Sequence, residues 1–113
     1  MSKKIVIYIN TDRLGRGDDA LGTILMEAYL ETLLNTAPTL SHVLLINSGV
    51  KLICENSPHL EIMQQLATLD IEILACGTCI NHYGLKKTMK VGSISNMATI
   101  FEIQASAAHV LMP

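Results

Sequence analysis

Short runs of aliphatic and β-branched residues alternate along this chain with longer segments of helical periodicity, and this alternation constrains the fold more than any other feature. Parallel strands need long crossover connections, which are usually helices. The pattern therefore predicts an α/β fold with a mostly parallel sheet and helices on both faces. The expected strands are residues 4–9, 42–46, 71–75, 89–91 and 109–112.

The segments between these runs carry signals for the start and end of helices. Residues 19–35 are expected to form the first helix, with Asp18 and Asp19 at its start and Ala37-Pro38 after its end. Its predicted apolar stripe is Leu21, Ile24, Leu25 and Ala28, and Leu33 and Leu34 widen it.

Three further helices are expected. The second opens at Ser57-Pro58, a hydroxyl cap followed by proline, and the third covers residues 79–87. The fourth runs to residue 107 from a cap at Ser93 or Ser95. Residues 50–55 fit either a short helix or an extended piece.

Length and composition limit the classes of function. A chain of 113 residues is expected to form one domain over residues 1–113. Half of its residues are apolar and only 16% are charged, so we expect some apolar surface to be buried between subunits. A net charge of −2 and the absence of tryptophan argue against a nucleic-acid partner.

No apolar run is long enough for a membrane span. The run at residues 5–9 is cut by polar residues from Asn10 onward, too early for an export signal. We therefore expect a cytoplasmic protein with no membrane partner. In a reducing compartment its three cysteines are not a disulfide framework.

The sequence Cys76-Gly77-Thr78-Cys79 follows an apolar run directly and carries the strongest chemical signal. A thiolate where a strand ends and a helix begins is stabilised by unpaired backbone N–H groups, which lowers its pKa. Four interpretations remain open: two buried structural thiols, a persulfide carrier, a dithiol oxidoreductase, and a metal-holding pair. Haem attachment is excluded because Ile80 stands where a histidine is needed, and zinc lacks a fourth ligand at suitable spacing. No metal or other cofactor is expected.

Other polar residues follow the expected strands or the thiol pair. Because ligands bind beyond the carboxyl ends of parallel strands, Ser48 and Asn96 are candidate binding residues, although Asn96 also suits a helix cap. His82 is either a solvated helix residue or a group that assists a thiol. Arg13 and Arg16 either shape their loop or steady an anion above the thiols. Cys54 is expected to pack in the core.

Several motifs in order along the chain resemble the DsrE/DsrF family of small sulfur-relay proteins. The resemblance is closer to the C-terminal domain of YedF-type proteins, a sulfurtransferase-like group linked to selenium metabolism. The matching motifs are LGRGDD at 14–19 with LG at 21–22, NSGVKL at 47–52, ACGTC at 75–79 with YGL at 83–85, and VG at 91–92 with SNM at 95–97.

The resemblance implies a three-layer α/β/α fold with a five-stranded sheet, of the DsrEFH type, assembled into homotrimers or homohexamers. It also implies a cysteine that carries persulfide, here Cys76 with Cys79 as its partner. YedF-type proteins usually contain a TusA-like sulfur-donor module, which these 113 residues do not include. The expected donor is then a separate TusA-like protein. The main alternative function is a non-catalytic oligomeric binding module with a structural or metal-holding thiol pair.

Overall fold

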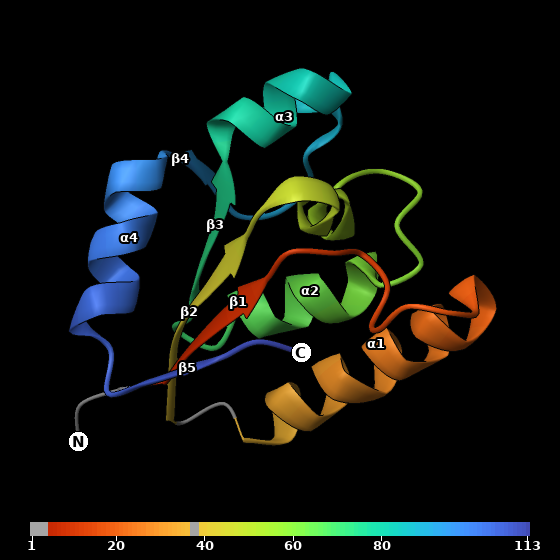
Figure 1. The fold of residues 1–113 in the computed structure, drawn as a ribbon, viewed down its shortest axis with the longest axis horizontal. Coiled ribbons are helices and arrows are strands. Elements are labelled where there is room, and N and C mark those ends of the chain that lie inside the picture. Colours follow the sequence, from red (N-terminus) through yellow and green to blue (C-terminus); the bar gives the residue numbers. More distant parts are fainter. Residues whose placement is uncertain (1–4, 37–38) are drawn as a thin grey trace.

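Five parallel strands form one sheet in the order β4-β3-β2-β1-β5 (Figure 1). The computed structural model describes residues 5–36 and 39–113. The α/β class with a five-stranded parallel sheet is therefore confirmed. The strands are β1 (Ile5–Ile9), β2 (Leu40–Leu45), β3 (Glu72–Cys76), β4 (Ser93–Ser95) and β5 (His109–Leu111).

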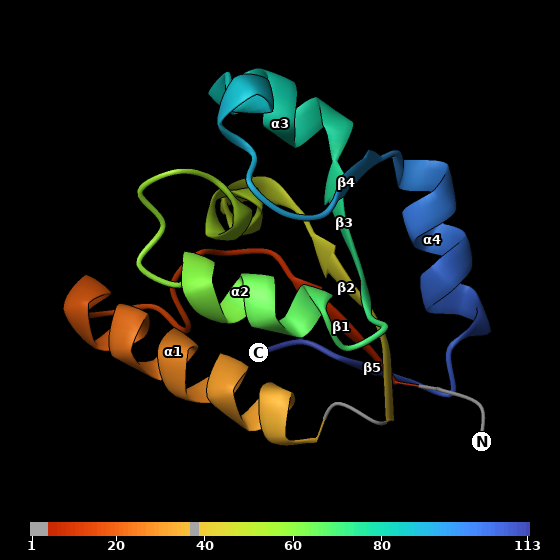
Figure 2. The same cartoon turned by 180° about the vertical axis from the view of Figure 1, so that it is seen from behind.

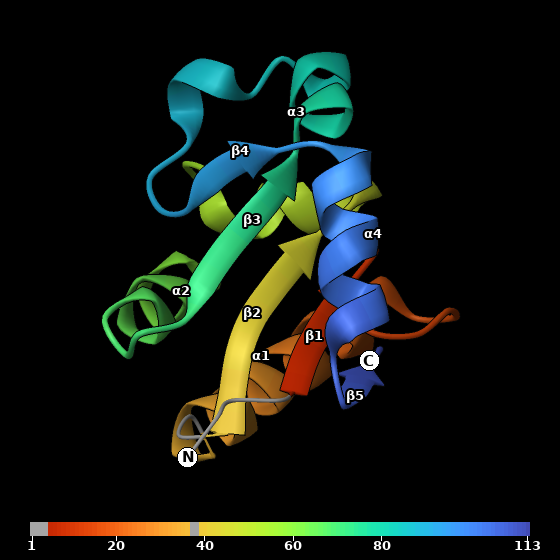
Figure 3. The same cartoon turned by 90° about the vertical axis from the view of Figure 1, so that its left-hand side faces the viewer.

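Helices cover both faces of the sheet, which gives three layers. The helices α1 (Asp19–Asn35) and α2 (Leu60–Ala67) lie behind the sheet in Figure 3, and α4 (Met97–Ser106) lies in front of it. Strand residues alternate between two buried clusters because successive side chains point to opposite faces. In β3, for example, Ile73 and Ala75 pack with α1 and α2, whereas Leu74 and Cys76 pack with Ile100 of α4.

Two short helices and a 3₁₀ turn stand at the carboxyl edge of the sheet. The 3₁₀ helix η2 (Asn47–Ile53) follows β2, and α3 (Gly77–Tyr83) follows β3 without a loop (Figures 1 and 2). A further 3₁₀ turn, η3 (Lys86–Thr88), leads towards β4. The helix α4 then returns the chain across the sheet to β5, which pairs with β1. This edge holds the residues from which the sequence predicted a site.

The fourth strand was predicted in the wrong place. Residues 89–91 form no ladder; Met89 makes only an isolated antiparallel bridge with Cys54, and β4 is Ser93–Ser95. The apolar side chains Met89 and Val91 pack against the main core, so their hydrophobicity reflects burial rather than strand pairing. The true edge strand is short and mostly exposed, and therefore lacks an apolar signal.

The predicted apolar stripe of α1 was correct only at Leu33. The buried residues of this helix are Gly22, Met26, Leu30 and Leu33, whereas Leu21, Ile24, Leu25 and Ala28 are exposed. This helix carries apolar residues on more than one side, so periodicity does not select the face that packs. The packed face of α1 is the one that carries Gly22, where the preceding loop comes so close that a Cβ would lie 3.1 Å from the Arg13 Cβ. The buried face is the one that allows this close approach of the preceding loop.

Helix boundaries shift by a few residues from those expected. The start of α1 is confirmed, since the Asp18 side chain accepts a hydrogen bond from the Ala20 N–H at 3.0 Å. The Ala37-Pro38 stop lies outside the described residues. Helix α2 begins later than predicted, after a turn in which the Ser57 hydroxyl accepts from the His59 N–H. Asn96, rather than Ser93 or Ser95, caps α4.

Candidate functional site

The two cysteines of the motif lie at the junction of β3 and α3. Cys76 is both the last residue of β3 and the N-cap of α3, and it pairs with Ser95 of β4. Its side chain is buried with Ile100 beneath α4, and the residue is 3% exposed. Cys79 lies in the first turn of α3 and is half-buried. The pair therefore combines one buried and one reachable thiol.

Two glycines, one between the cysteines and one at the end of α3, allow this junction. A Cβ on Gly77 would lie 3.2 Å from both the Ile94 side chain and the Ser95 carbonyl oxygen, so a small residue lets β4 approach the start of the helix. Gly84 ends α3 in the left-handed conformation with φ of 65°, as is common at helix C-termini. The helix is thus confined to two turns above the sheet edge.

Hydrogen bonding favours negative charge on Cys76. Burial acts to raise the pKa of the Cys76 thiol, but hydrogen bonds from the backbone and side chains of Cys79 and Thr78 outweigh it. The net effect is a pKa below the ordinary value of a cysteine. The sulfur forms no full capping hydrogen bond in this rotamer, but these donors lie close enough to stabilise a thiolate. Of the two thiols of the motif, Cys76 is therefore the one that ionises more readily.

The pKa of Cys79 is shifted in the opposite direction, above the ordinary value of a cysteine. Burial raises its pKa, and both the hydrogen bond with Cys76 and the negative charge on Cys76 raise it further. The backbone N–H of Asn47, 3.1 Å from the Cys79 sulfur, opposes this shift without cancelling it. When Cys76 loses its proton, Cys79 therefore keeps its own, and its S–H can donate to the Cys76 thiolate.

A polar network from η2 supports Cys79. Asn47 adopts a left-handed backbone conformation with φ of 55°, which asparagine tolerates better than most residues, and its N–H reaches the Cys79 sulfur. Its side-chain oxygen accepts a hydrogen bond from the Tyr83 hydroxyl at 2.9 Å. The Lys51 ammonium lies 4.5 Å from the centre of the Tyr83 ring. This network links η2 to both ends of α3.

The predicted binding residues are distributed unevenly around the thiols. The Ser48 hydroxyl is next to Asn47 and accepts a hydrogen bond from the Asp12 N–H at 3.2 Å. Asn96 follows the residue that pairs with Cys76, but its side-chain oxygen is used to cap α4 through the Thr99 N–H at 2.9 Å. His82 is exposed and stacks edge-on against Tyr83; within the described residues no hydrogen bond or ion pair joins it to either thiol.

An open hollow of about 590 Å³ begins beside the Asn47 amide. It lies at the carboxyl ends of β1, β2 and β5, between the strands where the sheet order reverses, which is where parallel sheets usually bind ligands. Arg16 contributes a cation to its wall, whereas Arg13 is held by Asp19 at 2.9 Å. The lining residues are Tyr8, Asn10, Thr11, Gly15, Arg16, Ile46, Asn47, Ser48 and Pro113.

Sequence reasoning missed the residues that tune the two thiols. Asn47 entered the sequence analysis only within the NSGVKL motif, and Thr78 only as a residue between the two cysteines. The available signal for Asn47 was an asparagine just after a buried strand, because asparagine adopts the left-handed conformation more readily than most residues. Tyr83 had no such signal, because its contact depends on how η2 and α3 pack.

The remaining cysteine and the metal interpretation can be placed from the same geometry. Cys54 is 1% exposed, donates to the Val50 carbonyl, and has a pKa raised by burial, as expected for a core thiol. Among residues 5–36 and 39–113, no group of three or more histidine, cysteine or acidic side chains is arranged to hold a metal ion.

Comparison with known proteins shows the fold. No protein-family model matches the chain, and no curated protein matches it significantly. It is similar in structure to the YchN protein from E. coli, with a TM-score of 0.75 at 16% identity over 99% of this chain and 100% of the other. It is also similar to MTH1491 from Methanobacterium thermoautotrophicum, with a TM-score of 0.73 at 15% identity over 99% and 100% of the two chains.

A third similar structure is BT1422 from Bacteroides thetaiotaomicron, with a TM-score of 0.69 at 14% identity over 97% and 95% of the two chains. MTH1491 and BT1422 are both described as proteins of unknown function. At these identities the similarity establishes a common YchN-type fold and nothing about activity. No helix in the described part of the chain is long and apolar enough to cross a membrane.

Proposed function

We propose that this chain is a cytoplasmic sulfur-relay protein of the DsrE/DsrF kind, closest to the YedF-type domain, whose single domain carries sulfur as a persulfide on Cys76. The supporting observation is the asymmetry of the thiol pair: hydrogen bonds lower the pKa of Cys76, whereas burial and the neighbouring charge raise that of Cys79. A carrier needs one thiolate to accept sulfur and a second thiol that does not compete for it.

The proposed sulfur transfer needs no cofactor, because each step forms one bond to sulfur and breaks another. The Cys76 thiolate attacks the terminal sulfur of a donor persulfide, forms a sulfur–sulfur bond, and releases the donor as a thiolate. An acceptor thiolate then attacks the terminal sulfur of Cys76, takes it as a new persulfide, and restores the Cys76 thiolate. In the absence of an acceptor, Cys79 attacks the inner sulfur and expels hydrosulfide, leaving a disulfide that needs an external thiol reductant.

Neighbouring groups have distinct proposed roles. Ser48 lies beside the Asn47 amide in the wall of the open hollow, where it would contact an incoming sulfur group. Asn96 would line the opposite side while it caps α4. His82 is exposed on α3, a suitable position to contact a docked partner. Because Cys76 itself is buried, we expect the first turn of α3 to open when a donor reacts.

The proposed partners are further copies of this chain, as a homotrimer or homohexamer, and a separate TusA-like donor protein. Self-association is supported by large apolar side chains that a single copy leaves exposed on α4, β4 and β5, including Phe101 at 65% and Met97 at 55%. The others are Ile94 on β4 at one edge of the sheet, and Val110, Leu111 and Met112 in or just after β5 at the other edge.

Persulfide trapping tests the proposed carrier function. The protein is treated with glutathione persulfide, alkylated without reduction, and mapped by mass spectrometry. We expect one added sulfur atom on Cys76, and a longer-lived adduct in Cys79→Ser because the internal release step is removed. The matched control is Cys54→Ser, which should leave the yield unchanged because that thiol is buried and has a raised pKa.

Other outcomes would identify the alternatives. A Cys76–Cys79 disulfide with no persulfide in any variant would make the protein a dithiol oxidoreductase. If Cys76 stays unmodified while low-molecular-weight thiols added to the same sample react fully, the carrier function is refuted. The alternative of a non-catalytic binding module would then remain.

A further inference from the structure

Positive and negative side chains are distributed unevenly over this molecule. The lysines and arginines among residues 5–36 and 39–113 all lie in residues 10–19, 47–56 and 77–92, the segments that follow the carboxyl ends of β1, β2 and β3. They are Arg13, Arg16, Lys51, Lys86, Lys87 and Lys90. The acidic residues outside these segments are Glu27, Glu31, Glu61, Asp70, Glu72 and Glu102. The side of the molecule that carries the thiol pair is therefore more positive than the rest.

The acidic residues within the same three segments already have partners. The contacts are those of Asp12 and Asp19 with Arg13 at 3.6 and 2.9 Å, of Glu55 with Lys90 at 3.1 Å, and of the Asp18 side chain with the Ala20 N–H at 3.0 Å. Four cations in the described part of the chain are exposed and pair with no carboxylate there. These are Arg16, Lys51, Lys86 and Lys87.

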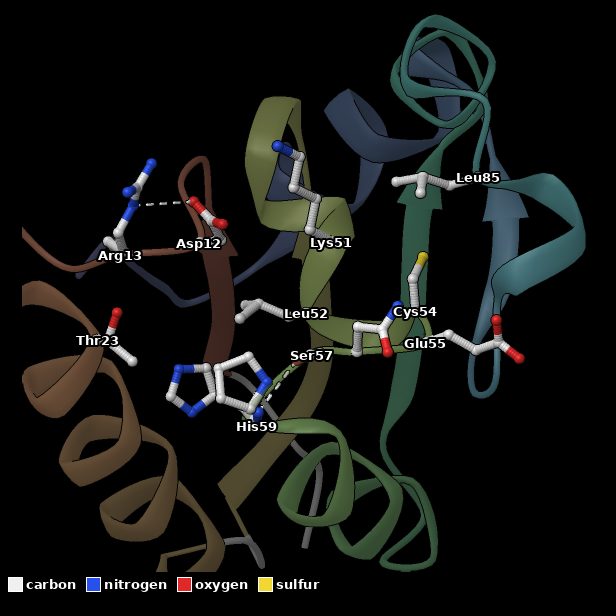
Figure 4. Close-up of a pocket in the computed structure, with 12 residues that line it drawn as sticks. Asp12, Arg13, Thr23, Lys51, Leu52, Cys54, Glu55, Ser57, His59 and Leu85 are labelled. Carbon is white, nitrogen blue, oxygen red and sulfur yellow. Dashed lines mark hydrogen bonds and ion pairs between the residues drawn. The ribbon is translucent and has the colours of Figure 1, made fainter. Parts of the chain in front are cut away.

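Lys51 is connected to the reachable thiol through a short series of contacts. Its ammonium lies 4.5 Å from the centre of the Tyr83 ring, and the Tyr83 hydroxyl donates to the Asn47 side chain at 2.9 Å. The Asn47 N–H in turn donates to the Cys79 sulfur at 3.1 Å. Figure 4 shows Lys51 of η2 and Leu85, the residue before η3, at the carboxyl edge of the sheet. Lys51 is therefore a free cation beside the helix that carries Cys79.

The other two lysines belong to the same packed region. Lys86 and Lys87 are exposed residues of η3, which begins shortly after α3 ends. The Lys90 N–H donates to the Ile53 carbonyl at 2.8 Å, and this hydrogen bond joins the segment after η3 to the end of η2. The elements that carry the three free lysines are thus held together next to α3.

We propose that the surface formed by Lys51, Lys86 and Lys87 docks an acidic segment of a partner protein. Docking there brings the partner's reacting sulfur to the Cys76–Cys79 pair. The inference deepens the sulfur-relay proposal and rests on it for the nature of the partner. Opposite charges attract over a Debye length, about 10 Å at 0.1 M salt, and so orient an approaching protein before contact.

The distribution of charge favours an acidic protein segment over other anions. Lysines spread over two surface elements can contact several carboxylates of one segment, whereas a single small anion would leave most of them unpaired. A long polyanion such as a nucleic acid would extend beyond the three lysines and meet the acidic residues of the other elements, which repel it.

Thiol–disulfide exchange with synthetic peptides tests the proposal. Each peptide carries one cysteine, activated as a 2-thiopyridyl disulfide and flanked by glutamates, glutamines or lysines. The protein is the full chain with Cys54→Ser, so only the two thiols of the motif can react. A motif thiolate attacks the peptide sulfur, forms a protein–peptide disulfide, and expels the thiopyridine thiolate, whose absorbance gives the rate.

The expected result is a preference for the acidic peptide that depends on salt. At low salt the glutamate peptide should react about tenfold or more faster than the glutamine peptide, and the lysine peptide should react slowest. In about 1 M salt the three rates should converge. The preference should fall roughly threefold or more in Lys86→Gln/Lys87→Gln. The matched control is Gln64→Glu/Gln65→Glu on α2, which changes the net charge equally at exposed positions away from η3 and should largely keep the preference.

Several results would overturn the docking surface. These are no exchange with any peptide, equal rates for the glutamate and glutamine peptides, a preference that survives high salt, and an equal loss in the lysine variant and its control. Stronger inhibition of exchange by an oligonucleotide than by a cysteine-free glutamate peptide would also overturn it, in favour of a nucleic-acid partner. Exchange needs no sulfane sulfur, so a preserved acidic preference with failed persulfide trapping would refute the carrier function alone.

Discussion

Removing one hydroxyl group beside Cys76 should change how the reactivity of this thiol depends on pH. The variant is Thr78→Val, which keeps the shape of the side chain and deletes the hydroxyl that donates to Cys76. The backbone donors of residues 78 and 79 remain. Because the lost bond stabilises the thiolate and not the thiol, we expect the pKa of Cys76 to rise in the variant.

The size of the effect follows from the strength of the lost bond. A hydrogen bond to a charged group contributes about 1.5 kcal/mol at the low end, which suits an exposed donor such as Thr78. This corresponds to roughly a tenfold smaller thiolate fraction at pH values below the pKa. The more basic thiolate of the variant is also intrinsically more nucleophilic, with a Brønsted coefficient of about 0.45. This raises the rate constant of the thiolate roughly threefold and so offsets part of the loss.

The two effects predict pH–rate profiles that cross. Below the pKa of Cys76, Thr78→Val should be alkylated about threefold more slowly than wild type; above it, where both proteins are ionised, about threefold faster. The assay is iodoacetamide alkylation read at Cys76 by peptide mass spectrometry, and Thr78→Ser is the control that restores the hydroxyl. Parallel profiles, or a change equally present in Thr78→Ser, would refute the proposed role of the hydroxyl.

Three further changes test packing, capping and assembly. Gly49→Ala should destabilise the fold by roughly 2 kcal/mol in urea unfolding, because its Cβ would collide with the Ile9 carbonyl oxygen; an unchanged midpoint would show that the backbone relaxes without strain. Cys76→Ser should be more stable than Cys76→Ala by about 1 kcal/mol, since only serine retains an N-cap acceptor, and equal stabilities would argue against a capping role. Phe101→Glu should lower the oligomeric state in light scattering, with the exposed Glu102→Gln as control; an unchanged mass would remove α4 from the interface.

The fold was largely predictable because the sheet strands that carry it are buried on both faces. Near-continuous apolar runs in β1, β2 and β3 identify parallel strands, and the helices between them fix their crossovers. Edge elements were harder. The strand β4 owes its position to pairing with β3 and not to its own exposed side chains, so its three residues give no periodic signal. Exposed strand residues in β5 gave only a short apolar run.

The candidate site was also predictable only in part. A local motif placed Cys76 and Cys79 because both belong to one strand–helix junction, which the chain determines by itself. Contacts that join different elements were not predictable. The Asn47 amide reaches Cys79 across 32 positions of sequence, and the Glu27–His59 pair joins residues of two helical segments that meet only after packing. Each of these contacts depends on tertiary structure that composition and spacing do not encode.

The asymmetry of the thiol pair has its origin in the way helices begin. With Cys76 at the N-cap, Gly77 and Thr78 occupy the first two helical positions and Cys79 occupies the third. In a capping box, the side chain at the N-cap accepts from the third N–H, and the third side chain reaches back to the cap. Here the reaching group is a thiol, and it donates to the Cys76 sulfur rather than to the backbone. The contact between the two thiols therefore lowers the pKa of the first and adds to the increase that burial causes in the pKa of the second. With serine or threonine at the N-cap, the same geometry would only stabilise the helix. With cysteine at both the N-cap and the third position, the two side chains share a proton.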